Sequence, residues 1–221
     1  MRLVCISDTH GDHELLDLPE GDVLIHAGDL TGHGQCTETQ SFMSWFGRQP
    51  FTYKLCIAGN HDTFMEAEPA LTRRFAEDAG VLLLNDSGCE IDGVAFWGSP
   101  ITPRYYDWSF MRDPGASIEA HWELIPNSTD VLITHGPPHG ILDQVQRAED
   151  EFEHTGCPSL LRRIREVAPR IHLFGHIHEG HGQFHANNLS YFNVSTMNKE
   201  YRIAHAPVII DLANYSLRDS V

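Results

Sequence analysis

The sequence predicts a mixed α/β protein, in which strands and helices alternate along a chain of 221 residues. Short apolar runs with the length of buried strands recur from one end of the chain to the other. Longer segments between them carry hydrophobic residues at helical spacing. Hydrophobic residues make up 41% of the chain and charge is scattered, as in ordinary globular proteins. We therefore expect one domain over residues 1–221, with a full core.

In the first part of the chain, four apolar runs are short enough to be strands and two longer segments have helical spacing. Segment 37–49 carries three aromatic side chains on one helical face, so we expect this helix to pack on the sheet. Segment 68–79 is the second expected helix, and Pro69 lies in its first turn, where proline is well tolerated. The expected strands are 2–7, 22–27, 54–58 and 81–84.

The second part of the chain continues this alternation and adds a long loop. Asp92-Gly93 separates two runs that indicate a strand pair. Residues 98–112 are rich in proline and aromatic residues without a clear period, which predicts a surface loop of the length that is usually functional. We call this segment the Pro-aromatic loop. The remaining expected strands are 88–92, 94–97, 130–134, 170–174, 189–194 and 207–212, and the remaining expected helices are 117–125 and 158–168.

Charge and cysteine content exclude several classes of protein. Fifteen basic residues against 31 acidic ones give a net charge of −16, which disfavours broad binding to nucleic acid or to an anionic membrane. The five cysteines are odd in number and have no C-x-x-C spacing, so we expect reduced thiols and a cytoplasmic protein. The sequence begins with a strand and has no apolar run of about 18 residues, so we expect neither a signal peptide nor a membrane span.

Metal-binding side chains follow five of the expected strands. The run Ala58-Gly59-Asn60-His61-Asp62 is the clearest case, because an Asn amide oxygen can bind a cation without adding charge while the neighbouring His delivers a proton. The carboxyl ends of strands are where loops converge in α/β sheets, so we expect all of these side chains at one site. The side chains at strand ends are Asp8, His10, Asp29, Asn60, His61, His135, His176 and His178.

The number of these side chains favours two metal ions. With His61 left free as a proton donor, seven groups of mixed nitrogen and oxygen type remain, more than one ion needs. Asp29 is a lone carboxylate in the middle of the set and is the natural bridge between two ions. The absence of cysteine from the set argues against a structural zinc site.

In this order and spacing, the motifs resemble those of the calcineurin-like metallophosphoesterases, over residues 8 to 178. The resemblance implies a four-layer α/β/β/α sandwich of two mixed sheets flanked by helices. It also implies that Asp29 is shared by two divalent metal ions, for which we expect Mn²⁺, with Fe, Zn or Mg as alternatives. The implied ligands are Asp8, His10, Asp29 and His178 for one ion, and Asp29, Asn60, His135 and His176 for the other.

Three further segments resemble the metallophosphoesterase-domain-containing (MPPED) branch of that family: 98–103, 134–138 and 174–180. Some animal members have Gly at the position of His176, and this chain keeps the metal ligand. Members of the branch hydrolyse phosphodiesters, including cyclic nucleotides, and bind nucleoside monophosphates. The chain lacks the Arg and Asp that follow the Gly-Asp motif in protein Ser/Thr phosphatases, and it has Gly32 where purple acid phosphatases have a ligating Tyr.

The sequence thus predicts a metal-dependent phosphoric ester hydrolase, acting on small phosphodiesters such as cyclic nucleotides, without a membrane or a broad nucleic-acid partner. The alternatives are a phosphomonoesterase and a nucleotide-binding scaffold without catalysis. We expect His61 to be the general acid and Asp62 to be a catalytic residue beside it, although what orients His61 stays open. The aromatic side chains of the Pro-aromatic loop either stack on a nucleobase or anchor the loop. The expected substrate-binding residues are Asn60, His61, Tyr105, Tyr106 and Trp108.

Overall fold

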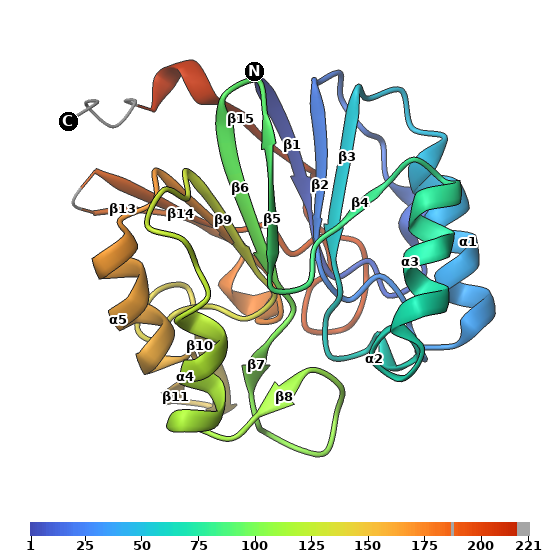
Figure 1. Cartoon of the computed structure of the whole chain (residues 1–221). Coiled ribbons are helices and arrows are strands. Elements are labelled where there is room, and N and C mark those ends of the chain that lie inside the picture. Colours follow the sequence, from blue (N-terminus) through green and yellow to red (C-terminus); the bar gives the residue numbers. More distant parts are fainter. Residues whose placement is uncertain (187, 216–221) are drawn as a thin grey trace.

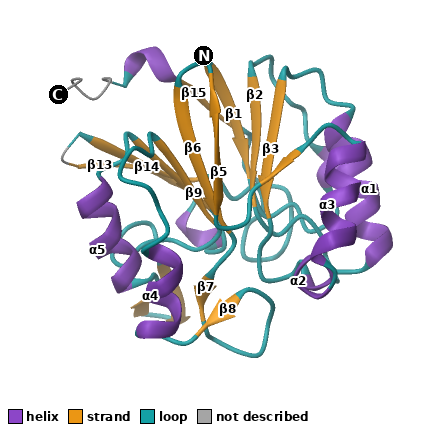
Figure 2. Cartoon of the chain, viewed as in Figure 1, coloured by secondary structure: helices purple, strands orange, loops and turns teal. Residues whose placement is uncertain are grey.

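The computed structural model describes residues 1–186 and 188–215 of the chain. Two mixed sheets form the centre of the molecule, and Figure 2 shows helices on both sides of them. The first sheet has the strand order β15-β1-β2-β3-β4, in which only β15 is antiparallel to its neighbour. Its strands are β15 (Val208–Asp211), β1 (Arg2–Ile6), β2 (Val23–Ala27), β3 (Tyr53–Ile57) and β4 (Leu82–Leu83).

The second sheet has the order β13-β14-β12-β9-β6-β5, with a parallel centre and an antiparallel strand at each edge. Its strands are β13 (Gly182–Ala186), β14 (Leu189–Asn193), β12 (Ile171–Phe174), β9 (Val131–Thr134), β6 (Val94–Ser99) and β5 (Ser87–Ile91). Two small ribbons complete the strands: the parallel pair β7 (Thr102–Pro103) and β8 (Met111–Arg112), and the hairpin β10 (Gln144–Ala148) and β11 (Glu151–His154).

The helices lie on the outer faces of the two sheets. Figure 1 shows α1 and α3 beside the first sheet and α4 and α5 beside the second. Each longer helix buries its apolar side chains, such as Phe42 and Phe46 of α1, against the strands. The helices are α1 (Cys36–Gly47), α2 (Thr63–Ala67), α3 (Pro69–Asp78), α4 (Ala116–Trp122) and α5 (Pro158–Val167), with short 3₁₀ turns at His13–Leu15, His178–Gly180 and Leu212–Asn214.

The alternation of side chains along the strands builds separate cores on the two faces of each sheet. Leu3 of β1 belongs to a core that also contains Ile133 of the second sheet and contains no buried residue of α1 to α5. Its neighbour Val4 belongs to the core that contains Phe42 of α1 and Ile164 of α5. The two sheets therefore pack face to face with helices outside, which confirms the predicted four-layer sandwich.

The predicted strands and helices are confirmed, with ends shifted by a few residues. Helix α2, strand β13 and the β10–β11 hairpin were not predicted from the sequence, and only a loop was predicted where β7 and β8 form. The hairpin strands are exposed on both faces apart from half-buried Val145, so they lack the alternation that identifies a strand. The longest helix in the described part of the chain has 12 residues, short of the roughly 20 that cross a bilayer.

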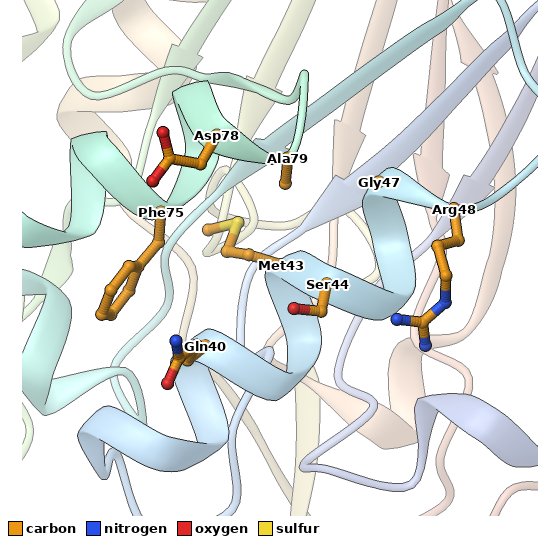
Figure 3. Close-up of a pocket in the computed structure, with 8 residues that line it drawn as sticks. All are labelled: Gln40, Met43, Ser44, Gly47, Arg48, Phe75, Asp78 and Ala79. Carbon is orange, nitrogen blue, oxygen red and sulfur yellow. The ribbon is translucent and has the colours of Figure 1, made fainter.

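A groove of about 360 Å³ opens between α1 and α3. Figure 3 shows Met43 and Phe75 among its lining residues, with Arg48 and Asp78 at the last turns of the two helices. These helix ends lead into the start of β3 and of β4, so the groove lies toward the amino ends of the strands. The predicted ligands follow the opposite, carboxyl ends.

Candidate metal centre

Five strands deliver the predicted ligands to one edge of the two sheets. The strands β1, β2 and β3 run parallel, as do β9 and β12, so their carboxyl ends meet where loops gather below the sheets in Figure 1. The structure brings all eight side chains of the strand-end set together there. These are Asp8 and His10 after β1, Asp29 after β2, Asn60 and His61 after β3, His135 after β9, and His176 and His178 after β12.

The backbone at these strand ends adopts a conformation that side chains usually avoid. Asp8, His10, Asp29 and His176 have φ values of +54°, +44°, +55° and +67°. A non-glycine residue with positive φ is uncommon and costs about 1 kcal/mol or more, and such residues cluster at functional sites. The glycine before His176 is also constrained, since a side chain at Gly175 would collide with the carboxylate of Asp8. These turns therefore place the ligand side chains at the cost of an unfavourable backbone conformation.

The donor atoms fall into two groups that meet at Asp29. Asp8, His10 and His178 form one group, and Asp29, His135 and His176 form the other, with the donor atoms of each group within 4.8 Å of one another. The donor atoms of His10, Asp29 and His61 also lie within that distance of one another, so His61 borders the centre. The Oδ2 atom of Asp29 lies 3.3 Å from Nε2 of His135 and 3.7 Å from Nε2 of His10. This oxygen thus lies between the two groups, as a bridging ligand must.

Backbone carbonyls fix the rings that face the centre. The Nδ1–H group of His135 donates to the carbonyl of Ala27, and that of His178 donates to the carbonyl of Asn198, each over 2.9 Å. In the neutral rings, the Nε2 lone pairs therefore point at the carboxylates, and Nε2 of His178 lies only 3.3 Å from Nε2 of His10. Imidazole nitrogens and carboxylate oxygens that converge in this way are the ligands expected for a pair of cations.

The two buried carboxylates are held in their ionised form. Burial by itself raises the pKa of Asp29, but the imidazoles of His135 and His10 outweigh it and hold that pKa well below its usual value. Burial by itself lowers the pKa of His135. The neighbouring Asp29 carboxylate has a larger, opposite effect and raises the pKa of His135 to about 9. Asp8 is ionised in the same way beside His178, and the hydroxyl of Ser195 donates to its Oδ2 over 2.7 Å.

Asn60 and His61 point to different parts of the centre. Oδ1 of Asn60 lies 3.0 Å from Nε2 of His135, in the second group of donors. The imidazole of His61 lies at the side of the first group, with its ring centre 4.5 Å from that of His10. Its Nδ1–H group donates to the carbonyl of Gly32 over 3.1 Å, and its backbone N–H donates to Oδ1 of Asp29 over 2.8 Å. The carbonyl of Gly32 thus orients His61.

Asp62 is fully buried, and its carboxylate contacts Leu30, Thr31 and Gly59. Its carboxylate accepts hydrogen bonds from Gly59 N at 2.7 Å, Leu30 N at 3.2 Å, and Thr31 through both N at 2.9 Å and Oγ1 at 2.7 Å. Among the hydrogen bonds of residues 1–186 and 188–215, none joins Asp62 to the imidazole of His61. The carboxylate ties the loop after β2 to the loop after β3, and its catalytic role stays a prediction.

The structure brings one of the three predicted aromatic side chains to the centre. The ring centre of Trp108 lies 4.3 Å from that of His61. Tyr105 and Tyr106 contact each other instead, with ring centres 4.4 Å apart, and Arg147 of β10 donates to the hydroxyl of Tyr105. Both tyrosines are exposed, so a role in substrate binding stays a prediction for them.

The sequence analysis missed the contribution of the loop after β14. Ser195 donates to Asp8, the carbonyl of Asn198 accepts from His178, and the ring of Tyr201 lies against His10 and His178. Since β14 is parallel to β12, the loop that follows it reaches the same edge as the ligand loops. No local pattern in the sequence marks this loop, because its place at the centre follows from the pairing of β14 with β12.

Comparisons with known proteins show the family and the fold. The family described as calcineurin-like phosphoesterase matches residues 1–180. The human metallophosphoesterase domain-containing protein 1 is 37% identical over 233 residues, which cover 96% of this chain and 71% of that protein. Phosphopantetheinyl hydrolase from Mycobacterium tuberculosis has the same fold, with a TM-score of 0.60 at 15% identity over 90% of each chain. An archaeal phosphodiesterase superimposes with a TM-score of 0.52 at 15% identity, over 99% of this chain and 98% of its own.

Proposed function

The chain belongs to the calcineurin-like phosphoesterase family, in its MPPED branch, and on that premise we propose that it is a dinuclear phosphodiesterase for small phosphodiesters, with cyclic nucleotides as substrates. One observation carries the proposal: Oδ2 of Asp29 lies between two groups of donors, and the imidazole of His61 stands beside them. The fold and the metal-dependent chemistry belong to the family as a whole, whereas the choice of a diester is our inference for this chain.

In this proposal, one divalent ion would be held by Asp8, His10 and His178, the other would be held by Asn60, His135 and His176, and Asp29 would be shared by both. When bound, the ions supply positive charge to the phosphoryl oxygens and acidify water to near neutrality. Imidazole and carboxylate ligands suit several first-row metals, and we propose Mn²⁺, with Fe, Zn and Mg as alternatives.

His61 donates the proton that the leaving oxygen needs. Its Nδ1–H is engaged by the carbonyl of Gly32, so Nε2 is the atom that exchanges the proton. A general acid of this kind accelerates the departure of a poor leaving group by about 10² to 10⁴. Gly32 is itself held in place, because its backbone N–H donates to Oε1 of Glu38 over 3.3 Å.

Charge favours a diester over a monoester as the substrate. A monoester carries about two negative charges at neutral pH and a diester carries one, so a monoesterase benefits from an added side-chain cation. The arginines of the Pro-aromatic loop are already paired: Arg104 with Asp113 at 2.6 Å, and Arg112 with Glu66 at 3.1 Å. The resemblance to an archaeal protein described as a phosphodiesterase points the same way.

The experiment is a substrate panel with metal-stripped and Mn²⁺-reloaded protein. The panel compares bis-p-nitrophenyl phosphate, p-nitrophenyl phosphate, and 2′,3′- and 3′,5′-cyclic nucleotides. We expect turnover only after reloading, higher kcat/KM on diesters than on the monoester, and loss of activity below about pH 6, where protons compete for the imidazole ligands. Higher kcat/KM on the monoester would indicate a phosphomonoesterase. Full metal occupancy without turnover on any ester would indicate a nucleotide-binding scaffold.

We also propose that the protein works in the cytoplasm. All five cysteines are free thiols in the structure. Cys5 and Cys56 are buried in strands, where burial raises the pKa of both thiols and keeps them unreactive.

A further inference from the structure

Tyr201 lies beside the predicted metal ligands His10 and His178, on a loop for which no role was predicted from the sequence. Its ring centre lies 4.9 Å from that of His10, 5.0 Å from that of His178 and 6.2 Å from that of His61. Tyr201 is 54% exposed, although its ring packs against the rings of the two predicted ligands His10 and His178. About half of the surface of Tyr201 is therefore open to a ligand beside the predicted metal ligands.

Hydrogen bonds of the surrounding turn fix the backbone position of Tyr201. Tyr201 has a φ of +55°, a conformation that is unusual for an aromatic residue. Its backbone N–H donates to the carbonyl of Asn198, and the side-chain oxygen of Asn198 accepts from the N–H groups of Glu200 and Arg202. The same Asn198 carbonyl accepts from Nδ1–H of His178. The turn is therefore fastened to a predicted ligand, and its tip carries the tyrosine.

A second aromatic side chain reaches His61 from another loop. The ring of Trp108 lies 4.3 Å from that of His61, and the side chain is 43% exposed. The Pro-aromatic loop that carries it is anchored by Glu66 of α2, whose carboxylate accepts from Phe110 N over 2.8 Å. Two half-exposed aromatic rings thus lie near the same imidazole, with ring centres 4.3 Å and 6.2 Å from that of His61, on two separate loops.

We propose that Tyr201 is a specificity-determining residue that, together with Trp108, binds a flat aromatic ring in the organic part of the phosphoester. The inference rests on the proposed function in one respect, because it takes the metal centre as the place where the phosphoryl group binds. With the phosphoryl group there, an organic group that extends from the centre beside His61 comes within reach of both aromatic side chains. Stacking of a base on an aromatic side chain contributes about 1–3 kcal/mol, without requiring a particular base.

The test measures binding and needs no turnover. Calorimetry with the Mn²⁺-loaded protein compares AMP with ribose 5-phosphate, which has the same phosphate and no base, and phenyl phosphate with methyl phosphate. The variants are Tyr201→Leu, which removes the ring, and Tyr201→Phe, which keeps it. Phe184→Leu is the matched control, because Phe184 is an exposed aromatic residue on β13 outside the metal centre.

We expect the wild-type protein to bind AMP more tightly than ribose 5-phosphate. Tyr201→Leu should weaken AMP binding by about 5- to 150-fold and change ribose 5-phosphate binding less than about twofold, whereas Tyr201→Phe and Phe184→Leu should retain AMP binding. If phenyl phosphate loses affinity in Tyr201→Leu as AMP does, the site accepts aryl groups in general. If only AMP loses affinity, the site selects a nucleobase. Both results support the proposal.

Equal effects of Tyr201→Leu on AMP and on ribose 5-phosphate would overturn the proposal, as would loss of Mn²⁺ from this variant. The second result would mean that Tyr201 shields the histidine ligands and does not bind substrate. A failure of the proposed function would give a different result. AMP would still bind in a base-dependent manner that requires Tyr201, but no ester in the panel would be hydrolysed.

Discussion

The Nδ1 atom of His61 lies 3.1 Å from the carbonyl oxygen of Gly32. A carbonyl oxygen only accepts hydrogen bonds, so Nδ1 carries a proton whether the ring is neutral or charged. Nε2 is then the atom that gains and loses the exchangeable proton. Since Glu38 of α1 accepts from the N–H groups of Gly32, His33 and Gln35, the position of the carbonyl is tied to the start of that helix.

His61→Gln should lower kcat/KM in a manner that depends on the leaving group. General acid catalysis supplies about 10² to 10⁴ in rate where the leaving oxygen is a poor one, such as a ribose hydroxyl. Departure of p-nitrophenolate needs no proton, so the loss there should be small. The measurement is the ratio of variant to wild-type kcat/KM on a cyclic nucleotide and on bis-p-nitrophenyl phosphate, with metal content determined in parallel. Equal ratios, or loss of a metal ion, would assign His61 a ligand or structural role.

Asp62→Asn should reduce activity on both substrates by the same factor. The carboxylate accepts four hydrogen bonds from Gly59, Leu30 and Thr31, and an amide can accept at only one of its two positions. The loss of buried bonds should lower the free energy of unfolding by about 1–3 kcal/mol and loosen the loops that carry Asp29 and Asn60. Urea unfolding and the two-substrate comparison check this prediction. A loss confined to the poor leaving group would favour the catalytic role predicted from the sequence.

The strand-end side chains could be predicted because their signal is short and local. Each apolar run ends at a polar residue, and the parallel order of an α/β sheet then brings those ends together. Their partners are less visible: the carbonyls of Ala27, Gly32 and Asn198 orient three histidines, yet a backbone carbonyl has no sequence signature. The sequence could therefore indicate which side chains meet and could not indicate what orients them.

Some of the fold escaped prediction for related reasons. In β13, Gln183, Phe184 and His185 are all exposed, so the strand shows no apolar face and is defined only by its pairing with β14. Tyr201 follows β14 in a turn whose shape depends on Asn198 hydrogen bonds, and nothing in the residue order marks the ring as part of the centre. Such features arise from tertiary pairing and not from local propensity.

His176→Gly should empty one side of the centre while the fold survives. His176 lies on the turn after β12, and burial lowers its pKa to about 4, so the ring is neutral and ready to bind a cation at physiological pH. We expect one metal ion per chain to be lost or weakly held, and turnover to fall at least about tenfold, as for loss of one catalytic ion. Metal analysis and circular dichroism are measured together. Two fully occupied ions with normal turnover would show that His176 is not a ligand.

Glu66→Ala should loosen the Pro-aromatic loop without affecting the metal ions. Its carboxylate accepts from Phe110 N over 2.8 Å and from Arg112 Nη1 over 3.1 Å, and these bonds hold the loop that places Trp108 on His61. Losing hydrogen bonds to a charged group costs about 1.5–3 kcal/mol when buried and less at this half-exposed position. We expect KM for a cyclic nucleotide to rise about threefold to tenfold, with kcat and metal content near wild type. A fall in kcat with unchanged KM would contradict this.

His172→Gln should flatten the dependence of stability on pH. His172 is fully buried on β12, and its Nε2 lies 2.8 Å from Oγ1 of Thr134. Burial lowers its pKa to about 3, while the unfolded chain takes up the same proton near pH 6.5. Between these values the unfolded state binds more protons than the folded state. Stability is therefore full above about pH 6.5 and falls by about 1.4 kcal/mol per pH unit as the pH drops toward 3.

Glutamine keeps a polar atom near the position of Nε2 and does not titrate, so the variant should lose this acid sensitivity while still bonding Thr134. At pH 7 we expect His172→Gln to be less stable than wild type by about 1–3 kcal/mol, since a buried side chain is repacked. At pH 5 the difference should shrink by about 2 kcal/mol, because only wild type has to exclude a proton there. Urea unfolding of the metal-free proteins at pH 7, 6 and 5 measures this, with His33→Gln at an exposed position as the matched control. Parallel curves for wild type and His172→Gln would mean that the buried ring does not resist protonation, and that the acid sensitivity of the fold has another source.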